Sequence, residues 1–143
     1  MSQRKRVLFV CIGNACRSQM AEAFARAQGN DVLAPASAGL SPAGALPKST
    51  LLAMQEKNLD LSGHFPKSLT SLSLAEFDLI VNMSGLPIPR ERGKAVREWN
   101  VPDPIGMDYE DHCVIRDQIE TLVMNLILEL RLAAITAPSE TSG

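Results

Sequence analysis

The chain has 143 residues, of which 45% are hydrophobic, and its formal net charge is −2 at pH 7. This length and composition predict one globular domain with a sizeable core and argue against a disordered chain. The nearly neutral charge gives no reason to expect binding to nucleic acid or a membrane surface, and no apolar run is long enough to cross a bilayer. Three cysteines without a disulfide pattern favour the reducing cytoplasm.

Apolar periodicity and turn residues predict alternating strands and helices along the chain. The expected strands cover residues 6–11, 32–37, 77–82 and 94–98, and the expected helices cover residues 17–28, 47–58 and 111–133. The alternation predicts an α/β fold, with a parallel sheet of about four strands and helices on both faces. Residues 1–135 are expected to form this single domain, and residues 136–143 a disordered tail.

The most informative segment follows the first expected strand and reads Cys-Ile-Gly-Asn-Ala-Cys-Arg-Ser over residues 11–18. Gly13 adopts positive φ freely and Asn14 tolerates it, so the loop can turn its N–H groups inward as a nest for an anion. The next helix adds the positive end of its dipole. The guanidinium of Arg17 matches two oxygens of a tetrahedral oxyanion. These features predict a phosphate loop after the first strand, with oxyanion contacts from Ile12, Gly13, Asn14, Ala15, Cys16 and Arg17.

Cys11 lies at the base of this positively charged loop, where the thiolate is favoured over the thiol. A thiolate is a nucleophile that needs no neighbouring base, and the hydroxyl of Ser18 can donate to its sulfur. Two other interpretations exist. Cysteine is among the most buried residue types, so Cys11 is alternatively a core residue at a strand end. The spacing of Cys11 and Cys16 also suits zinc, but Arg17 would repel a cation and no second ligand pair is evident, so no metal site is expected.

Asp103 stands between Pro102 and Pro104, which stiffen the loop that carries its carboxylate. A stiff loop can present a carboxylate over a site as a general acid, although Asp-Pro pairs are also common in ordinary turns. His112 lies in an acidic segment and is expected to be exposed. Cys113, next to it, is expected to be a partly buried helix residue or a thiol with a redox role.

The segment FVCIGNACRSQMAEAF resembles the phosphate loop of the low-molecular-weight protein tyrosine phosphatases and, equally, that of the arsenate reductases which share their fold. The likeness extends over most of the chain, including residues 37–40, 62–69, 77–83 and 101–104. It implies that Cys11 is the nucleophile, that Arg17 clamps the oxyanion, and that Asp103 protonates the leaving oxygen and then activates water. It further implies a hydrogen-bond network that supports the loop, formed by Asn14, Ser18, Ser37 and His64. By its own sequence context, His64 is alternatively an exposed loop residue.

The chain departs from both branches of the resemblance. Phosphotyrosine-specific members place aromatic residues after the Asp-Pro pair, where this chain has Ile105 and Gly106. Gln19 and residues 116–120 look more like the arsenate reductases. The thioredoxin-linked reductases, however, use two further cysteines near the third strand, and residues 82–85 of this chain contain none.

We therefore expect a cytoplasmic phosphomonoester hydrolase, a protein tyrosine phosphatase, that acts through a phosphocysteine intermediate on a phosphorylated protein or a small oxyanion. The alternative is an arsenate reductase that depends on an external thiol or a glutaredoxin-like donor. A non-catalytic oxyanion-binding regulatory module is a third hypothesis, but binding alone needs neither a thiolate nor an acid. No cofactor is expected.

Overall fold

The computed structural model describes residues 4–89 and 94–136, and its elements occur in the predicted order. The strands are β1 (Lys5–Cys11), β2 (Leu33–Gly39), β3 (Leu79–Asn82) and β4 (Ala95–Glu98). The α-helices are α1 (Arg17–Gly29), α2 (Lys48–Gln55) and α3 (Tyr109–Thr136), and two short 3₁₀ helices are η1 (Leu69–Ser71) and η2 (Leu74–Glu76). Helix α3 includes Thr136, which the sequence assigned to the tail, and residues 137–143 lie outside the described residues.

Most element boundaries differ from the prediction by a few residues, and two of these differences have a local reason. Helix α2 was expected to continue to residue 58, but it ends at Gln55 and the chain turns away through Asn58, which has a φ of 61°. Strand β3 begins at Leu79 rather than at residue 77, because the chain bends at Asp78 after η2, which ends at Glu76. Asn58 is tolerant of positive φ, so the sequence carried a signal for the earlier end of α2.

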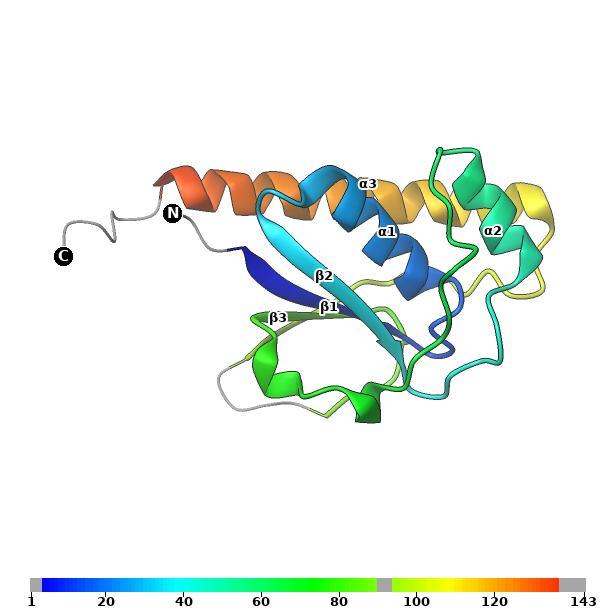
Figure 1. Cartoon of the computed structure of the whole chain (residues 1–143), viewed down its shortest axis with the longest axis horizontal. Helices are drawn as coiled ribbons and strands as arrows, with labels where there is room; N and C mark the ends of the chain where they lie inside the picture. The colour runs from blue at the N-terminus through cyan, green and yellow to red at the C-terminus, as the bar shows by residue number, and fades with distance from the viewer. Residues whose placement is uncertain (1–3, 90–93, 137–143) are drawn as a thin grey trace.

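The four strands form one parallel sheet in the order β2-β1-β3-β4, with β1 at an interior position (Figure 1). Cys11, the last residue of β1, pairs with Gly39 of β2, and Val10 pairs with Asn82 of β3. The loop after β1 therefore begins between the carboxyl ends of its two neighbours. This edge is where open parallel sheets bind ligands.

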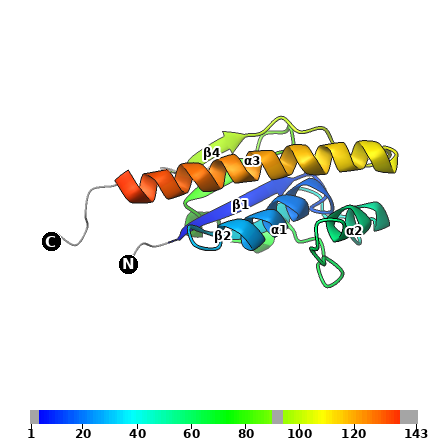
Figure 2. The same cartoon turned by 90° about the horizontal axis from the view of Figure 1, so that it is seen from above.

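Side chains of β1 alternate between two apolar clusters, one on each face of the sheet. Val7 and Phe9 pack in the larger cluster with residues of α1 and α3, whereas Leu8 and Val10 pack on the other face. Figures 1 and 2 show α1 and α3 side by side over the first face. The second face is covered by the segment that contains η1 and η2, including Leu69 and Phe77. No helix in the described part of the chain is long and apolar enough to span a membrane.

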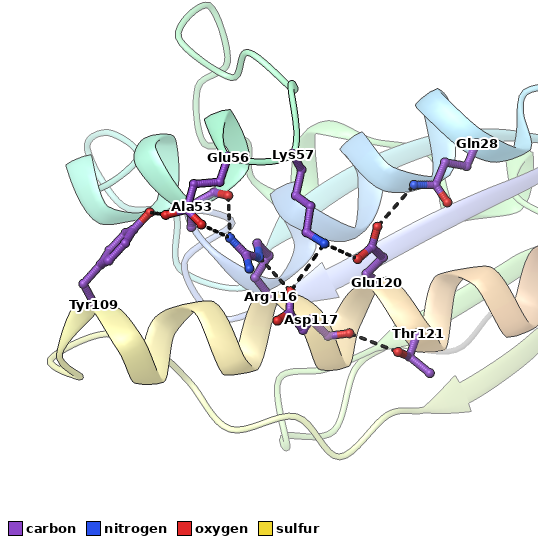
Figure 3. A network of polar contacts seen from close by, with 9 residues as sticks. All are labelled: Gln28, Ala53, Glu56, Lys57, Tyr109, Arg116, Asp117, Glu120 and Thr121. Carbon is purple, nitrogen blue, oxygen red and sulfur yellow. Dashed lines mark hydrogen bonds and ion pairs between the residues drawn. The ribbon is translucent and has the colours of Figure 1, made fainter.

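Helix α2 is held against α3 by a polar network, shown in Figure 3. The guanidinium of Arg116 donates to the carbonyl of Ala53 at 2.9 Å and to the carboxylate of Glu56 at 3.1 Å. Lys57 pairs with Glu120 at 2.9 Å. These contacts fix the position of α2. Figures 1 and 2 both show that α2 lies beyond the carboxyl end of β1. They bring residues of α2 and of the first turns of α3 next to the loop after β1.

Candidate active site

The loop after β1 keeps its carbonyl groups on the outside. The carbonyls of Cys11, Ile12 and Gly13 accept hydrogen bonds from the amides of residues 40, 41 and 43, at 2.8 to 3.1 Å. Asn14 has a φ of 50°, which reverses the direction of the chain inside the loop. Within residues 4–89 and 94–136, the N–H groups of residues 12–16 donate to no protein acceptor. Successive amides in this state, next to a helix N-terminus, are a site for an anion.

Gly39 allows β2 to approach this loop closely. A Cβ at this position would lie 2.7 Å from the carbonyl oxygen of Ile12 and 2.8 Å from the amide nitrogen of Asn14. Both distances are shorter than any that real side chains show, and both partners are backbone atoms. Only glycine fits here without distorting the loop. Nothing in the local sequence around Gly39 indicates this role.

Cys11 and Ser18 lie together at the base of the loop, with Cys11 Sγ 3.0 Å from Ser18 Oγ. Both are buried. The side-chain nitrogen Nδ2 of Asn14 donates to Ser18 Oγ at 2.7 Å, so the hydroxyl proton of Ser18 remains for the sulfur. The predicted contact between Ser18 and Cys11 is therefore present in the structure. A donor aimed at sulfur stabilises a thiolate.

Asn14 is also held from the opposite side. Its Oδ1 accepts from the backbone nitrogen of Lys67 at 2.8 Å, from Lys67 Nζ at 3.4 Å and from Gln19 Nε2 at 3.1 Å. His64 Nδ1 lies 3.2 Å from Gln19 Oε1 and is half-buried. His64 thus reaches Asn14 through Gln19 rather than directly. From the sequence, Gln19 stands out only as a departure from the phosphatases, and Lys67 is not expected to support the loop.

Arg17, the first residue of α1, is buried and joins the loop to the ends of two other strands. Its Nη1 donates to the carbonyl of Met83 at 2.6 Å and to that of Val101 at 3.0 Å. Its Nη2 lies 3.6 Å from Asp103 Oδ2. Asp103 is 40% exposed, and its other oxygen accepts from the amide of Ile105. The structure therefore brings the predicted anion clamp and the predicted acid together.

A pocket of about 170 Å³ opens beside Arg17. Met83 and Gly85 line it from the loop after β3, and its other lining residues are Glu98, Trp99, Asn100 and Val101. The ring of Trp99 also packs on Phe9, with centroids 5.9 Å apart. An aromatic side chain thus borders the pocket beside Arg17, although none directly follows the Asp-Pro pair. This position of Trp99 is not expected from the sequence.

Two expectations about polar residues are corrected. Ser37 does not hydrogen-bond to the loop, because its hydroxyl donates to Glu22 of α1, which in turn pairs with Arg26. His112 is 1% exposed, not exposed as expected. It lies on the face of α3 that also carries Ile115 and Ile119, three and seven residues further on, and this helical spacing was the signal that the acidic neighbours obscured.

Cys16 is buried in the loop, and its Sγ accepts a hydrogen bond from Thr50 Oγ1 at 3.2 Å. Burial raises the pKa of its thiol to about 11, although the Thr50 hydroxyl opposes the shift. Cys113 is partly buried on α3. No group of three potential metal ligands occurs among the residues that the structure describes.

A four-stranded parallel sheet with a cysteine-containing phosphate loop after its first strand defines a class of α/β enzymes. The family model described as low molecular weight phosphotyrosine protein phosphatase matches residues 6–135, so the chain belongs to this family.

Both curated relatives and solved structures are similar to this chain over most of its length. A glutaredoxin arsenate reductase from Synechocystis is 32% identical over 130 residues, which is 88% of this chain and 98% of the relative. An arsenate reductase solved in its phosphate-binding state superposes with a TM-score of 0.80 at 29% identity, covering 88% of this chain and 98% of the other. A mutant of YwlE from Bacillus subtilis superposes with a TM-score of 0.79 at 26% identity, covering 89% and 99%.

Proposed function

We propose that this protein hydrolyses phosphomonoesters through a covalent intermediate on Cys11. The observation that carries the proposal is the position of Asp103, whose carboxylate lies 3.6 Å from the guanidinium of Arg17. A nucleophile, an anion clamp and an acid thus border one loop whose amides are available to a ligand. These three functions together suffice for transfer of a phosphoryl group to a cysteine and then to water.

The first chemical step forms a sulfur–phosphorus bond. The Cys11 thiolate attacks phosphorus while the bond from phosphorus to the ester oxygen breaks. Asp103, in its acid form, gives its proton to that leaving oxygen. Arg17 and the amides of residues 12–16 hold the three other oxygens, where negative charge gathers in the transition state.

The second step releases phosphate. Asp103, now a carboxylate, takes a proton from water as the water oxygen attacks phosphorus. The sulfur–phosphorus bond breaks and Cys11 leaves as a thiolate. Ser18 donates to this sulfur and stabilises the charge that it regains.

Exposed apolar and aromatic side chains near Arg17 support an aromatic leaving group, and hence a protein phosphotyrosine as the substrate. Trp99 lines the pocket beside Arg17 and offers an aromatic face. Ile105, which follows the Asp-Pro pair, and Leu86 in the loop after β3 are exposed apolar side chains on loops at this end of the sheet. A flat apolar ring that projects from the phosphate would contact such surfaces.

Arsenate reduction is a second candidate, and the names of the 32% identical relatives favour it. In this reaction Cys11 attacks arsenic and water leaves. An external thiol then attacks the Cys11 sulfur, so that arsenic keeps the electron pair of the sulfur–arsenic bond and departs as arsenite. The resulting mixed disulfide is reduced by a second thiol.

The other cysteines of this chain are poorly suited to replace the external thiol that attacks the Cys11 sulfur. Only Cys16 and Cys113 accompany Cys11 in the sequence. The Cys16 thiol is bonded to Thr50, and its pKa of about 11 leaves little thiolate at neutral pH. A reductase built on this chain would therefore depend on a glutathione-type thiol and a glutaredoxin-like partner.

Parallel assays of both substrates on one preparation decide between the candidates. We expect steady-state hydrolysis of an aryl phosphate with only enough reductant to keep Cys11 reduced, and no multiple turnover of arsenate with thioredoxin as sole donor. A Cys11→Ser variant serves as the blank. Arsenate turnover with glutathione and glutaredoxin, together with negligible ester hydrolysis, would select the reductase. Phosphate binding without turnover of either substrate would select the regulatory module.

A further inference from the structure

Three buried side chains from separate segments form a hydrogen-bonded line that ends at the phosphate loop. Thr50 Oγ1, on α2, lies 3.2 Å from Cys16 Sγ and 3.1 Å from Nε2 of His112, on α3. Each of the three residues is at most 3% exposed. The reaction steps above use neither Thr50 nor His112. A buried histidine that is bonded to a buried hydroxyl calls for a structural or a functional reason.

The direction of each bond follows from the available protons. Burial and the nearby charge of Arg116 lower the pKa of His112, so its ring is neutral at neutral pH and carries one N–H. Thr50 has a single hydroxyl proton, which it donates to Cys16 Sγ. Its oxygen must therefore accept from His112 Nε2–H. His112 thus fixes the rotation of the Thr50 hydroxyl, and Thr50 fixes the side chain of Cys16.

Cys16 occupies the residue immediately before α1, where a side chain commonly accepts hydrogen bonds from the first-turn amides. Cys16 makes no such bond. Its sulfur is instead drawn toward α2 and α3, into the core. The amides of the loop and of the first turn of α1 are consequently left for a ligand.

We propose that Thr50 and His112 are positioning residues for oxyanion binding. They hold the Cys16 side chain in the core, and thereby fix the loop backbone whose amides receive the oxyanion. The inference rests on the proposed function in one respect, namely that the loop binds an oxyanion. Neither residue touches the substrate, and each acts through Cys16.

The test compares variants of Thr50 by calorimetry with inorganic phosphate. Thr50→Val keeps the shape of the side chain and removes the hydroxyl, whereas Thr50→Ser keeps the hydroxyl and removes the methyl group. Loss of one hydrogen bond predicts a rise in the phosphate Kd of about three- to tenfold for Thr50→Val. Thr50→Ser should bind within about twofold of the wild type. Thr121→Val is the matched control, because within the described residues the Thr121 hydroxyl bonds only to the carbonyl of Asp117, on the exposed side of α3.

A spectroscopic readout separates positioning from general stability. Nitrogen NMR of the His112 ring should show the neutral form protonated at Nε2 in the wild type and in Thr50→Ser. In Thr50→Val the acceptor is absent, so the ring should populate both neutral forms. If Thr50→Val does not fold, His112→Phe, which keeps a ring and removes the N–H, should raise the phosphate Kd in the same direction.

The outcomes distinguish this inference from the function on which it rests. Absence of phosphate binding by the wild type would remove the proposed function. Wild-type affinity in a folded Thr50→Val or His112→Phe variant would overturn the positioning role while leaving that function intact. Equal weakening in Thr50→Ser and Thr50→Val would also overturn it, because the hydroxyl would then be irrelevant.

Discussion

At the scale of single residues, replacement of Cys11 should separate oxyanion binding from catalytic turnover. Replacement by serine leaves the loop amides, the terminus of α1 and Arg17 in place, but a serine hydroxyl is not ionised at neutral pH. We expect Cys11→Ser to lose turnover completely and to bind phosphate with an affinity close to that of the wild type. Steady-state kinetics and calorimetry on the same sample measure the two effects. Residual turnover near the wild-type rate would remove Cys11 as the nucleophile.

Asp103 has a role that depends on the leaving group. Asp103→Asn removes the proton donor but keeps the shape of the side chain, and general acids commonly contribute about 10²–10⁴-fold to a rate. We expect losses of this size for esters of poor leaving groups and smaller losses for activated aryl esters, which need little protonation. A leaving-group series, measured as kcat/KM, tests this. A uniform loss would instead indicate that Asp103 mainly orients Arg17.

Individual residues also show how much of the candidate site could be predicted from the sequence. Cys11, Arg17 and Ser18 follow one another in a short segment, so their association in space was readable from the motif. The loop-supporting role of Ser37, which only the family resemblance implied, is wrong, because its side chain bonds to Glu22 on α1. Gln19 and Lys67 both bond to Asn14, but they come from segments far apart in the chain. Contacts of that kind depend on the tertiary fold and leave no local pattern.

At the scale of elements, the sheet and its helices were predicted well because their signals are periodic and repeated. What could not be read was how closely the elements approach one another. Gly39 at the end of β2 is the clearest case, since its role depends on the backbone of the loop after β1. Thr50 is another case, because the contact of the Thr50 hydroxyl with Cys16 depends on how α2 packs on α3.

Substitution of Gly39 by alanine should damage the site more than the fold. The new Cβ would meet the carbonyl of Ile12 and the amide of Asn14, so the loop would have to shift. Displacements of about 1 Å in an active site can cost about 10²-fold in rate, and we expect a fall of that order in kcat/KM. Gly44→Ala is the control, because nothing lies within 4 Å of its added Cβ. A Gly39→Ala variant with wild-type kinetics would contradict the close approach.

At the scale of the whole molecule, His112 makes stability depend on pH. Burial and Arg116 hold the pKa of His112 below that of an unfolded histidine, and the carboxylate of Asp103 offsets this only in part. The unfolded chain therefore takes up the proton more readily, so stability is lost as the pH falls below about 6.5. Loss should continue until the pH passes the folded-state pKa. The buried thiol of Cys16 and the hydroxyl of Thr50 also face this ring, but neither carries a charge in this range.

Thermal unfolding between pH 7.5 and 5.5 measures this effect. We expect the midpoint of the wild type to fall over this range more steeply than that of His112→Phe, which has no ring proton to gain. The difference between the two slopes isolates His112 from the carboxylates that titrate nearby. If the midpoints of both proteins change with pH at the same slope, protonation of His112 does not account for the loss of stability in acid.

The several contacts of Asn14 have a consequence for the speed of ligand capture. Ser18, Gln19 and Lys67 hold its side chain from two sides, so the loop is already shaped before any ligand arrives. The conformational entropy of the loop is lost when the chain folds, not when it meets its ligand. Association should therefore be a single step without a preceding isomerisation. In rapid mixing, the observed rate should rise linearly with oxyanion concentration and show no plateau.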